Sequence, residues 1–155
     1  MELKPGYKQT EVGVIPEDWD CMPILKLAAP VANAIVGGPF GSDLVSADYV
    51  ADGVPVIRGQ NLGGRYLEGP YAHVSFAKAN SLATNLARFN DVVFTQRGSL
   101  GQVSLVPKEP FACYLVSQSQ MKVTVQQDKI IPEFLFSWFE SNLGQSSITL
   151  SAIQT

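Results

Sequence analysis

The chain has 155 residues, of which 46% are hydrophobic and 16% are charged. This balance excludes a disordered chain and is typical of one globular domain with its own core. The formal net charge of −3 argues superficially against a polyanionic partner, but the charge is unevenly distributed. Residues 1–20 carry five Asp or Glu against two Lys, whereas residues 53–108 carry six Lys or Arg against two Asp or Glu. The middle of the chain is therefore compatible with a surface that faces an anion.

Residues that usually hold metals or cofactors are scarce. The two cysteines, Cys21 and Cys113, lie far apart and His73 is the single histidine, whereas a structural zinc site needs four ligands. The sequence lacks a phosphate-binding loop, a dinucleotide-binding glycine motif, a nucleophile elbow and a cluster of acidic ligands. We therefore expect no metal, no cofactor, no catalytic residue and two buried free thiols. The polar N-terminal stretch and the lack of a long apolar run predict a cytoplasmic protein without a membrane span.

In chain order, residues 1–20 are expected to be extended, and Trp19 is expected to bury its ring as an anchor. Residues 38–43 form a turn with Phe40 at its tip. Burial of Phe40 in the core is favoured over a protruding wedge, because most aromatic side chains are buried. Short β-branched and apolar runs predict strands at residues 34–36, 53–57, 73–76, 92–94, 103–106, 112–116 and 121–125.

Local signals also predict helices. Ser75 is a plausible N-cap for a short helix over residues 76–83. Pro132 opens a helix in which apolar residues recur at helical spacing, and a second short helix follows, so that the C-terminal helices span about residues 132–152. Just before them, residues 121–125 alternate with a period of two, which places Lys122 on the face opposite to the apolar residues.

Two loops combine glycine with planar, multi-donor side chains, and each follows an apolar strand. Residues 58–61 read RGQN, and residues 96–102 read QRGSLGQ within an expected hairpin. Arg pairs bidentately with guanine, and Asn and Gln pair with adenine. Gln118 and Gln120 share one face if they are extended. The candidate DNA-binding residues are Arg58, Gln60, Asn61, Arg65, Gln96, Arg97, Ser99, Gln102, Gln118 and Gln120. Loops that bind carbohydrate or protein use similar amides, so composition alone leaves those partners open.

Six stretches, in this order, match a family pattern. They are GYKQTEVGVIPEDW (6–19), GPFGS (38–42), GVPVIRGQNL (53–62), DVVFTQRGSLGQVSLVP (91–107), SQSQM (117–121) and PEFLFSWFES (132–141). The sequence resembles the first target-recognition domain of the specificity (S) subunit of type I restriction–modification systems, over nearly its whole length. The resemblance implies an α+β fold, a twisted β-rich target-recognition domain with short peripheral helices, truncated before the spacer helix. Residues 1–155 would then be a single domain.

The resemblance also implies a function. The domain would read one half of a bipartite double-stranded DNA site without catalysis, while the methyltransferase (M) and restriction (R) subunits hold the AdoMet and ATP sites. Arg58 and Arg97 are expected to contact DNA, through phosphate or base. A domain that varies its target must vary its base-reading residues, so the loops at residues 63–71 and 108–114 are expected to carry more of the specificity. Two alternatives stay open: the recognition module of a fused methyltransferase or nuclease, and an assembly scaffold that binds protein.

Overall fold

The computed structural model describes residues 2–153. Its body contains two β-sheets, one mixed and one antiparallel. The larger sheet has five strands, in the order β4 (Tyr49–Val50), β6 (Ala72–Val74), β5 (Val54–Ile57), β10 (Tyr114–Val116) and β7 (Leu86–Ala87). In this sheet β5 and β10 are parallel, and the other neighbours are antiparallel. The smaller sheet is antiparallel, in the order β3 (Ile35–Gly37), β11 (Gln120–Val123), β8 (Val92–Thr95) and β9 (Val103–Leu105). The expected hairpin of β8 and β9 is thus confirmed.

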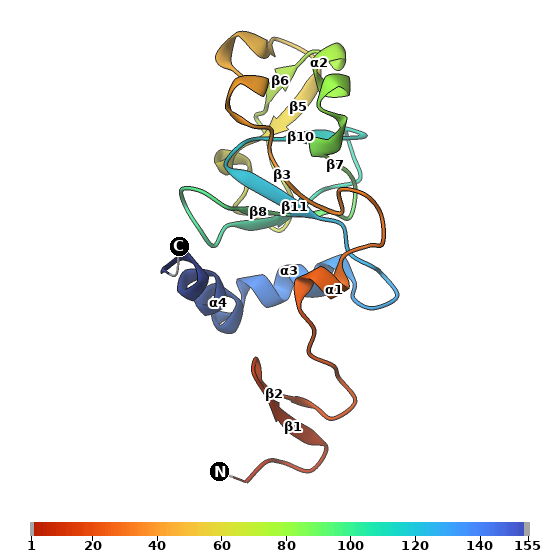
Figure 1. The fold of residues 1–155 in the computed structure, drawn as a ribbon, viewed down its shortest axis with the longest axis vertical. Helices are drawn as coiled ribbons and strands as arrows, with labels where there is room; N and C mark the ends of the chain where they lie inside the picture. The colour runs from red at the N-terminus through yellow and green to blue at the C-terminus, as the bar shows by residue number, and fades with distance from the viewer. Residues whose placement is uncertain (1, 154–155) are drawn as a thin grey trace.

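Short helices cover the outer faces of the two sheets (Figure 1). The α-helices are α1 (Ile24–Leu27), α2 (Phe76–Ser81), α3 (Pro132–Glu140) and α4 (Asn142–Ile153), and the 3-10 helices are η1 (Gly41–Asp43), η2 (Ser46–Asp48), η3 (Gly59–Asn61) and η4 (Ala83–Asn85). Two local predictions are confirmed, because Ser75 Oγ accepts from Lys78 N at 3.0 Å at the start of α2 and Pro132 opens α3. The α+β class is therefore correct. Among the described residues, no helix combines the length and the apolarity that a bilayer span requires.

Alternation along the strands produces three apolar layers. Val56 and Leu115 pack with Ala79 of α2 on the outer face of the five-stranded sheet. Ile57 and Val93 belong to the layer between the two sheets. The layer between the four-stranded sheet and α3 contains Val92, Val103, Leu105, Val123, Val125, Leu135, Phe136 and Phe139. In Figure 1, the five-stranded sheet with α2 beside it forms the upper part of the body, the four-stranded sheet lies below it, and α3 and α4 lie beneath that sheet.

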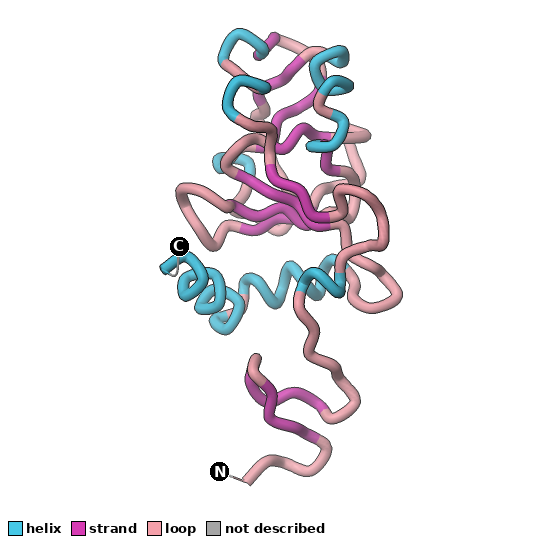
Figure 2. The backbone as a smooth tube through the Cα atoms, in the orientation of Figure 1, coloured by secondary structure: helices cyan, strands magenta, loops and turns pink. Residues whose placement is uncertain are grey.

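The N-terminal stretch differs from the extended chain that the sequence predicts. It forms a two-stranded hairpin, β1 (Tyr7–Thr10) and β2 (Gly13–Pro16), which projects away from the body beyond α3 and α4 (Figures 1 and 2). Thr10 Oγ1 donates to Gly13 O at 2.8 Å across its turn, and Gly13 has a φ of +110° that favours glycine. Trp19 stacks edge-to-face on Phe134 at 5.3 Å but remains 47% exposed, so it anchors the hairpin only partly.

One expectation about burial is wrong. Phe40 is 85% exposed, whereas its neighbour Pro39 and the next apolar residue, Leu44, are buried. Lys122, which the alternation places on the face opposite to the apolar residues, is also buried at 7% exposed, and its Nζ lies 3.5 Å from the buried carboxylate of Asp91. Strand alternation places a side chain on a face, but it does not determine whether that face is covered by another part of the chain.

Candidate nucleic-acid interface

Three loops that are distant in sequence meet around one polar pocket of about 380 Å³. Its lining comprises Gly59, Gln60, Thr95, Arg97, Ser99, Gln102, Ser119 and Gln120. The strand pairing explains the meeting. Because β5 and β10 are parallel neighbours, η3 and the turn at residues 117–120 follow the carboxyl ends of these two strands and lie at the same end of the sheet. The start of β11 then pairs with the end of β8, at Gln120 opposite Thr95, which places the β8–β9 loop beside that turn.

A chain of hydrogen bonds ties the floor of this pocket together. Gln102 Nε2 donates to Gly59 O at 3.3 Å, and Gln102 Oε1 accepts from Thr95 Oγ1 at 3.0 Å. Gln120 Nε2 donates to the same hydroxyl at 3.4 Å, and Gln120 Oε1 accepts from Ser117 Oγ at 2.5 Å. Gln120 is only 1% exposed. An amide both donates and accepts, so these side chains link three loops without leaving a buried polar atom unsatisfied.

The turn at residues 117–120 is held from both sides by further amides. Gln96 Nε2 donates to Gln118 O and Gln120 O, each at 3.1 Å. Gln118 Nε2 reaches the other way, to Gly41 O at 2.9 Å and Leu44 O at 3.4 Å. Gln120 N also donates to Ser117 O. Because this stretch is a turn and not an extended strand, Gln118 and Gln120 do not share one face as the sequence suggests.

The β8–β9 loop is supported from the C-terminal helices. Gly98 and Gly101 have φ values of +94° and +95°, a conformation that L side chains rarely adopt. Gln145 of α4 donates to Gly101 O at 2.9 Å and to Phe139 O at 2.7 Å. The loop therefore has a specified shape at its end nearest α3 and α4, and Gln145 is a supporting residue that the local pattern of the sequence does not reveal.

The side chains that remain free to contact a ligand lie on the rim. Gln60, Arg97 and Ser99 are exposed, and across residues 2–153 their side chains make no hydrogen bond or ion pair. Arg97 N donates to Ser119 O at 3.2 Å, so the backbone that carries this guanidinium is anchored. The rim thus presents one cation, one amide and one hydroxyl above a network that is already satisfied.

Asn61, Arg58 and Arg65 lie outside the lining of the pocket. Asn61 is 2% exposed, and its amide donates to Glu68 O and Pro70 O at 2.9 Å while its oxygen accepts from Arg58 N at 2.9 Å. A contact between DNA and the side chain of Asn61 or of Gln120 would require these loops to open. The Arg58 guanidinium lies 6.0 Å from the Tyr49 ring centroid, and its buried Nε has no acceptor within the described residues.

Arg65 is exposed on the loop at residues 63–71, with its guanidinium 5.9 Å from the Tyr66 ring centroid. The same loop touches the stretch at residues 108–114. Tyr71 packs edge-to-face on Phe111 at 5.9 Å and on Tyr114 at 5.5 Å. Burial raises the pKa of both phenols above the ordinary tyrosine value. The two loops expected to carry specificity are therefore in contact through an aromatic cluster.

Of the ten candidate residues, the structure brings Gln60, Arg97, Ser99, Gln102 and Gln120 together around one pocket. Gln96, Gln118 and Asn61 support its walls through bonds to carbonyl groups. Sequence reasoning misses Thr95 and Ser119, which line the pocket. The only sequence signal for them is their position next to Gln96 and Gln120.

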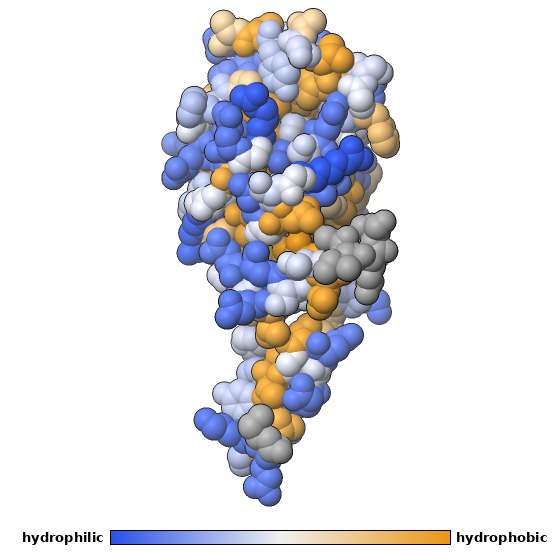
Figure 3. Space-filling model, turned by 90° about the vertical axis from the view of Figure 1, so that its left-hand side faces the viewer, coloured by the Kyte–Doolittle hydropathy of each residue, from blue (hydrophilic) through white to orange (hydrophobic). Residues whose placement is uncertain are grey.

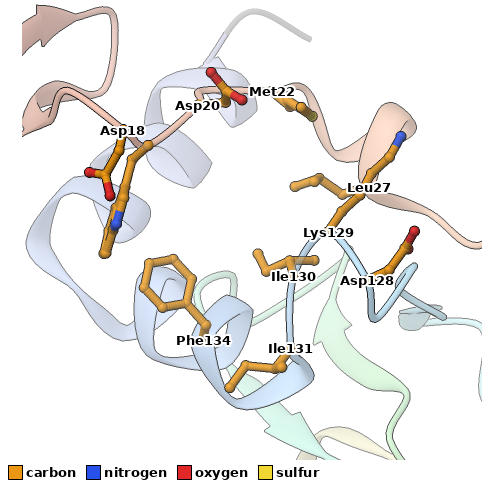
Figure 4. Close-up of a pocket in the computed structure, with 10 residues that line it drawn as sticks. Asp18, Asp20, Met22, Leu27, Asp128, Lys129, Ile130, Ile131 and Phe134 are labelled. Carbon is orange, nitrogen blue, oxygen red and sulfur yellow. The ribbon is translucent and has the colours of Figure 1, made fainter.

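A larger pocket, of about 550 Å³, lies where the N-terminal segment, α1 and the start of α3 meet (Figure 4). Apolar side chains such as Met22, Ile130 and Phe134 line it, together with three carboxylates, of Asp18, Asp20 and Asp128, and the single amine of Lys129. This excess of negative charge repels phosphate. The smaller polar pocket therefore fits a nucleic acid better, although it has the lesser volume.

Groups suited to metal binding or acid–base chemistry are not gathered elsewhere in the part of the chain that the structure describes. Within residues 2–153, no three His, Cys, Asp or Glu side chains are placed to hold a metal ion. His73 is half-buried, with its ring 6.2 Å from that of Phe111. Cys21 and Cys113 are free and half-buried.

Comparison with known proteins gives a fold likeness. No family model matches the chain, and no curated protein matches its sequence. The solved HsdS subunit from Thermoanaerobacter tengcongensis superposes with a TM-score of 0.55 at 11% identity, covering 97% of this chain and 30% of that chain. A second solved structure, from work on the complex assembly and conformational transition of the type I R-M system, superposes with a TM-score of 0.55 at 14% identity. This match covers 96% of this chain and 31% of that chain. The chain thus spans about a third of the length of these proteins, and its fold is similar to that of a segment of the HsdS subunit.

Proposed function

We propose that this chain is a target-recognition domain of a type I restriction–modification specificity subunit, and that it reads one half of a bipartite double-stranded DNA site without catalysing a reaction. The observation that carries the proposal is the meeting of three polar loops around Arg97 on a fold shared with HsdS. Residues 1–155 would act as a single domain in the cytoplasm. Methyltransferase and restriction subunits would supply the chemistry.

The proposed mechanism separates support from contact. The amides of Gln96, Gln102 and Gln120 hold the loops in place, so little conformational entropy is lost when DNA binds. Arg97, with Gln60 and Ser99 beside it, contacts the duplex, through phosphate oxygens or a guanine edge. Arg58 and Arg65 extend the contact, and the loops at residues 63–71 and 108–114 determine which sequence is preferred.

The first test is a binding selection. The chain is incubated with a library of random duplexes and the salt concentration is raised in steps, because non-specific electrostatic binding weakens as salt rises. Enrichment of one short motif is expected. If no motif is enriched, and the chain instead captures a methyltransferase subunit with no salt-dependent DNA binding, the scaffold alternative replaces this proposal. Turnover of DNA by the chain in the presence of Mg²⁺ and AdoMet would establish the fused-enzyme alternative.

Arg97→Ala then tests the assignment of the rim. A lost phosphate contact weakens binding to all duplexes alike and lowers the slope of log K against log salt by about 1. A lost base contact costs about 1–3 kcal/mol and relaxes one position of the motif. Arg88 is the matched control, because it is also exposed but precedes β8, whereas Arg97 follows that strand. Equal binding by Arg97→Ala and the unaltered chain would remove the β8–β9 loop from the interface.

A further inference from the structure

The loop after β3 presents an aromatic ring to solvent. Phe40 is 85% exposed, the largest exposed fraction among the large hydrophobic side chains of the described residues. Single exposed apolar residues are common on protein surfaces, so exposure alone assigns no role to Phe40. The second observation is that the backbone on both sides of Phe40 is held rigidly.

On its N-terminal side, the loop is packed against the turn at residues 117–120. Gly38 N donates to Gln120 O at 3.2 Å, and a Cβ on Gly38 would lie 1.9 Å from Ser117 O. The two backbones are therefore in a contact that only glycine permits. Pro39, which follows, is buried.

On its C-terminal side, the loop is held by a side chain of the same turn. Gln118 Nε2 donates to Gly41 O at 2.9 Å and to Leu44 O at 3.4 Å, and Leu44 is a core residue. Asp43 N donates to Phe40 O at 2.8 Å and closes η1. The exposed ring thus stands on a backbone anchored before and after it, so the entropy of ordering this loop is already lost in the free protein.

The position of this loop relates it to the polar pocket. The turn at residues 117–120 supports the Phe40 loop through Gln118 and contributes Ser119 and Gln120 to the pocket. In Figure 1, η1 and the β8–β9 loop both lie on the left-hand side of the body. Figure 3 looks onto that side, where hydrophilic and apolar residues are interspersed over the body and apolar residues follow the narrow N-terminal part.

We propose that Phe40 is an aromatic wedge that inserts at a base step of the DNA bound by the neighbouring loops, an inference that rests on the proposed function. Residues 38–45 carry Asp43 and no Lys or Arg, so phosphate anchoring is not the role of this loop. Apolar wedges inserted between base pairs unstack them and kink the duplex. Such a kink favours flexible base steps and adds sequence preference without hydrogen bonds to bases. A rigid support is what a wedge requires, because a mobile ring would move aside instead of separating the bases.

The test uses the full chain and the duplex enriched in the selection, with 2-aminopurine placed at each step of the motif in turn. Binding of the unaltered chain should raise fluorescence at one step, because unstacking relieves quenching. Phe40→Ala should abolish that rise and weaken binding about ten- to hundredfold, the range for loss of a base–aromatic contact. Phe40→Trp keeps a ring that can stack and should keep both signals. Phe76→Ala is the matched control, because Phe76 is 71% exposed on α2.

The outcomes separate this inference from the function on which it rests. If the selection enriches no motif, the proposed function fails and the wedge fails with it. If a motif is enriched but Phe40→Ala binds it with unchanged affinity and unchanged fluorescence, only the wedge is refuted. Loss of methyltransferase capture by Phe40→Ala with intact DNA binding would likewise refute the wedge and make the ring a protein contact.

Discussion

Substitution of Lys122 by methionine is expected to destabilise the fold far more than loss of a surface lysine. Lys122 and Asp91 are 7% and 3% exposed, and Nζ lies 3.5 Å from Asp91 Oδ2. At an effective dielectric constant of about 20, two unit charges at this distance attract by about 5 kcal/mol. Methionine preserves most of the packing volume but leaves the Asp91 carboxylate buried without a counter-charge, so we expect a loss of about 3–5 kcal/mol. The melting temperature should fall by about 6–20 °C.

Urea unfolding followed by far-UV circular dichroism measures this loss, and a double-mutant cycle isolates the charge pair. Asp91→Asn combined with Lys122→Met removes both charges, although Asp91 also accepts from Arg88 N at 2.9 Å and from Thr124 Oγ1 at 2.5 Å. The double variant should therefore lose less unfolding free energy than the sum of the two single losses, by about 2 kcal/mol or more. Lys108→Met, at an exposed position, should change stability by no more than about 0.5 kcal/mol.

Two results would refute the reasoning. One is a loss below about 1 kcal/mol for Lys122→Met, the value typical of solvent-exposed pairs. The other is additivity of the two substitutions within about 0.5 kcal/mol, which would show that the groups do not interact. Either result would mean that water reaches the pair and that β8 and β11 do not depend on it.

Two further predictions follow from the packing. Gly38→Ala should destabilise by about 1–3 kcal/mol and weaken DNA binding as Phe40→Ala does, because its Cβ would meet backbone at 1.9 Å. Gly41→Ala, which has no atom within 4 Å of its Cβ, is the control, and equal urea midpoints for the two variants would contradict the prediction. In a titration of phenol absorbance, Tyr71 and Tyr114 should keep their protons above pH 10, since burial raises the pKa of each. Because the folded state holds these protons more tightly than the unfolded state, the protonated phenols contribute stability that is fully present below about pH 10 and is lost as the pH rises further. A single titration midpoint shared by the folded and the urea-unfolded chain would contradict this prediction.

The candidate site shows how far residue type predicts role. The sequence identifies loops rich in Arg, Asn and Gln, but an amide donates equally well to a base or to a carbonyl of its own chain. In the structure, Gln96 and Gln118 donate to backbone carbonyls, and Asn61 does the same inside the core. Arg97 is different, because the loop that carries it turns its side chain to solvent. The acceptor of each donor is decided by strand pairing, which sequence spacing does not reveal.

The elements that depend on local interactions are the ones that could be predicted from the sequence. β-Branched runs predict the β8–β9 hairpin, Ser75 predicts the start of α2, and Pro132 predicts the start of α3, because each depends on residues within one turn or one strand. Long-range contacts decided the rest. The convergence of three loops on one pocket requires the parallel pairing of β5 with β10 and the pairing of β11 with β8. The burial of Lys122 and the exposure of Phe40 follow from which segments cover them, and that coverage exists only once the sheets have packed.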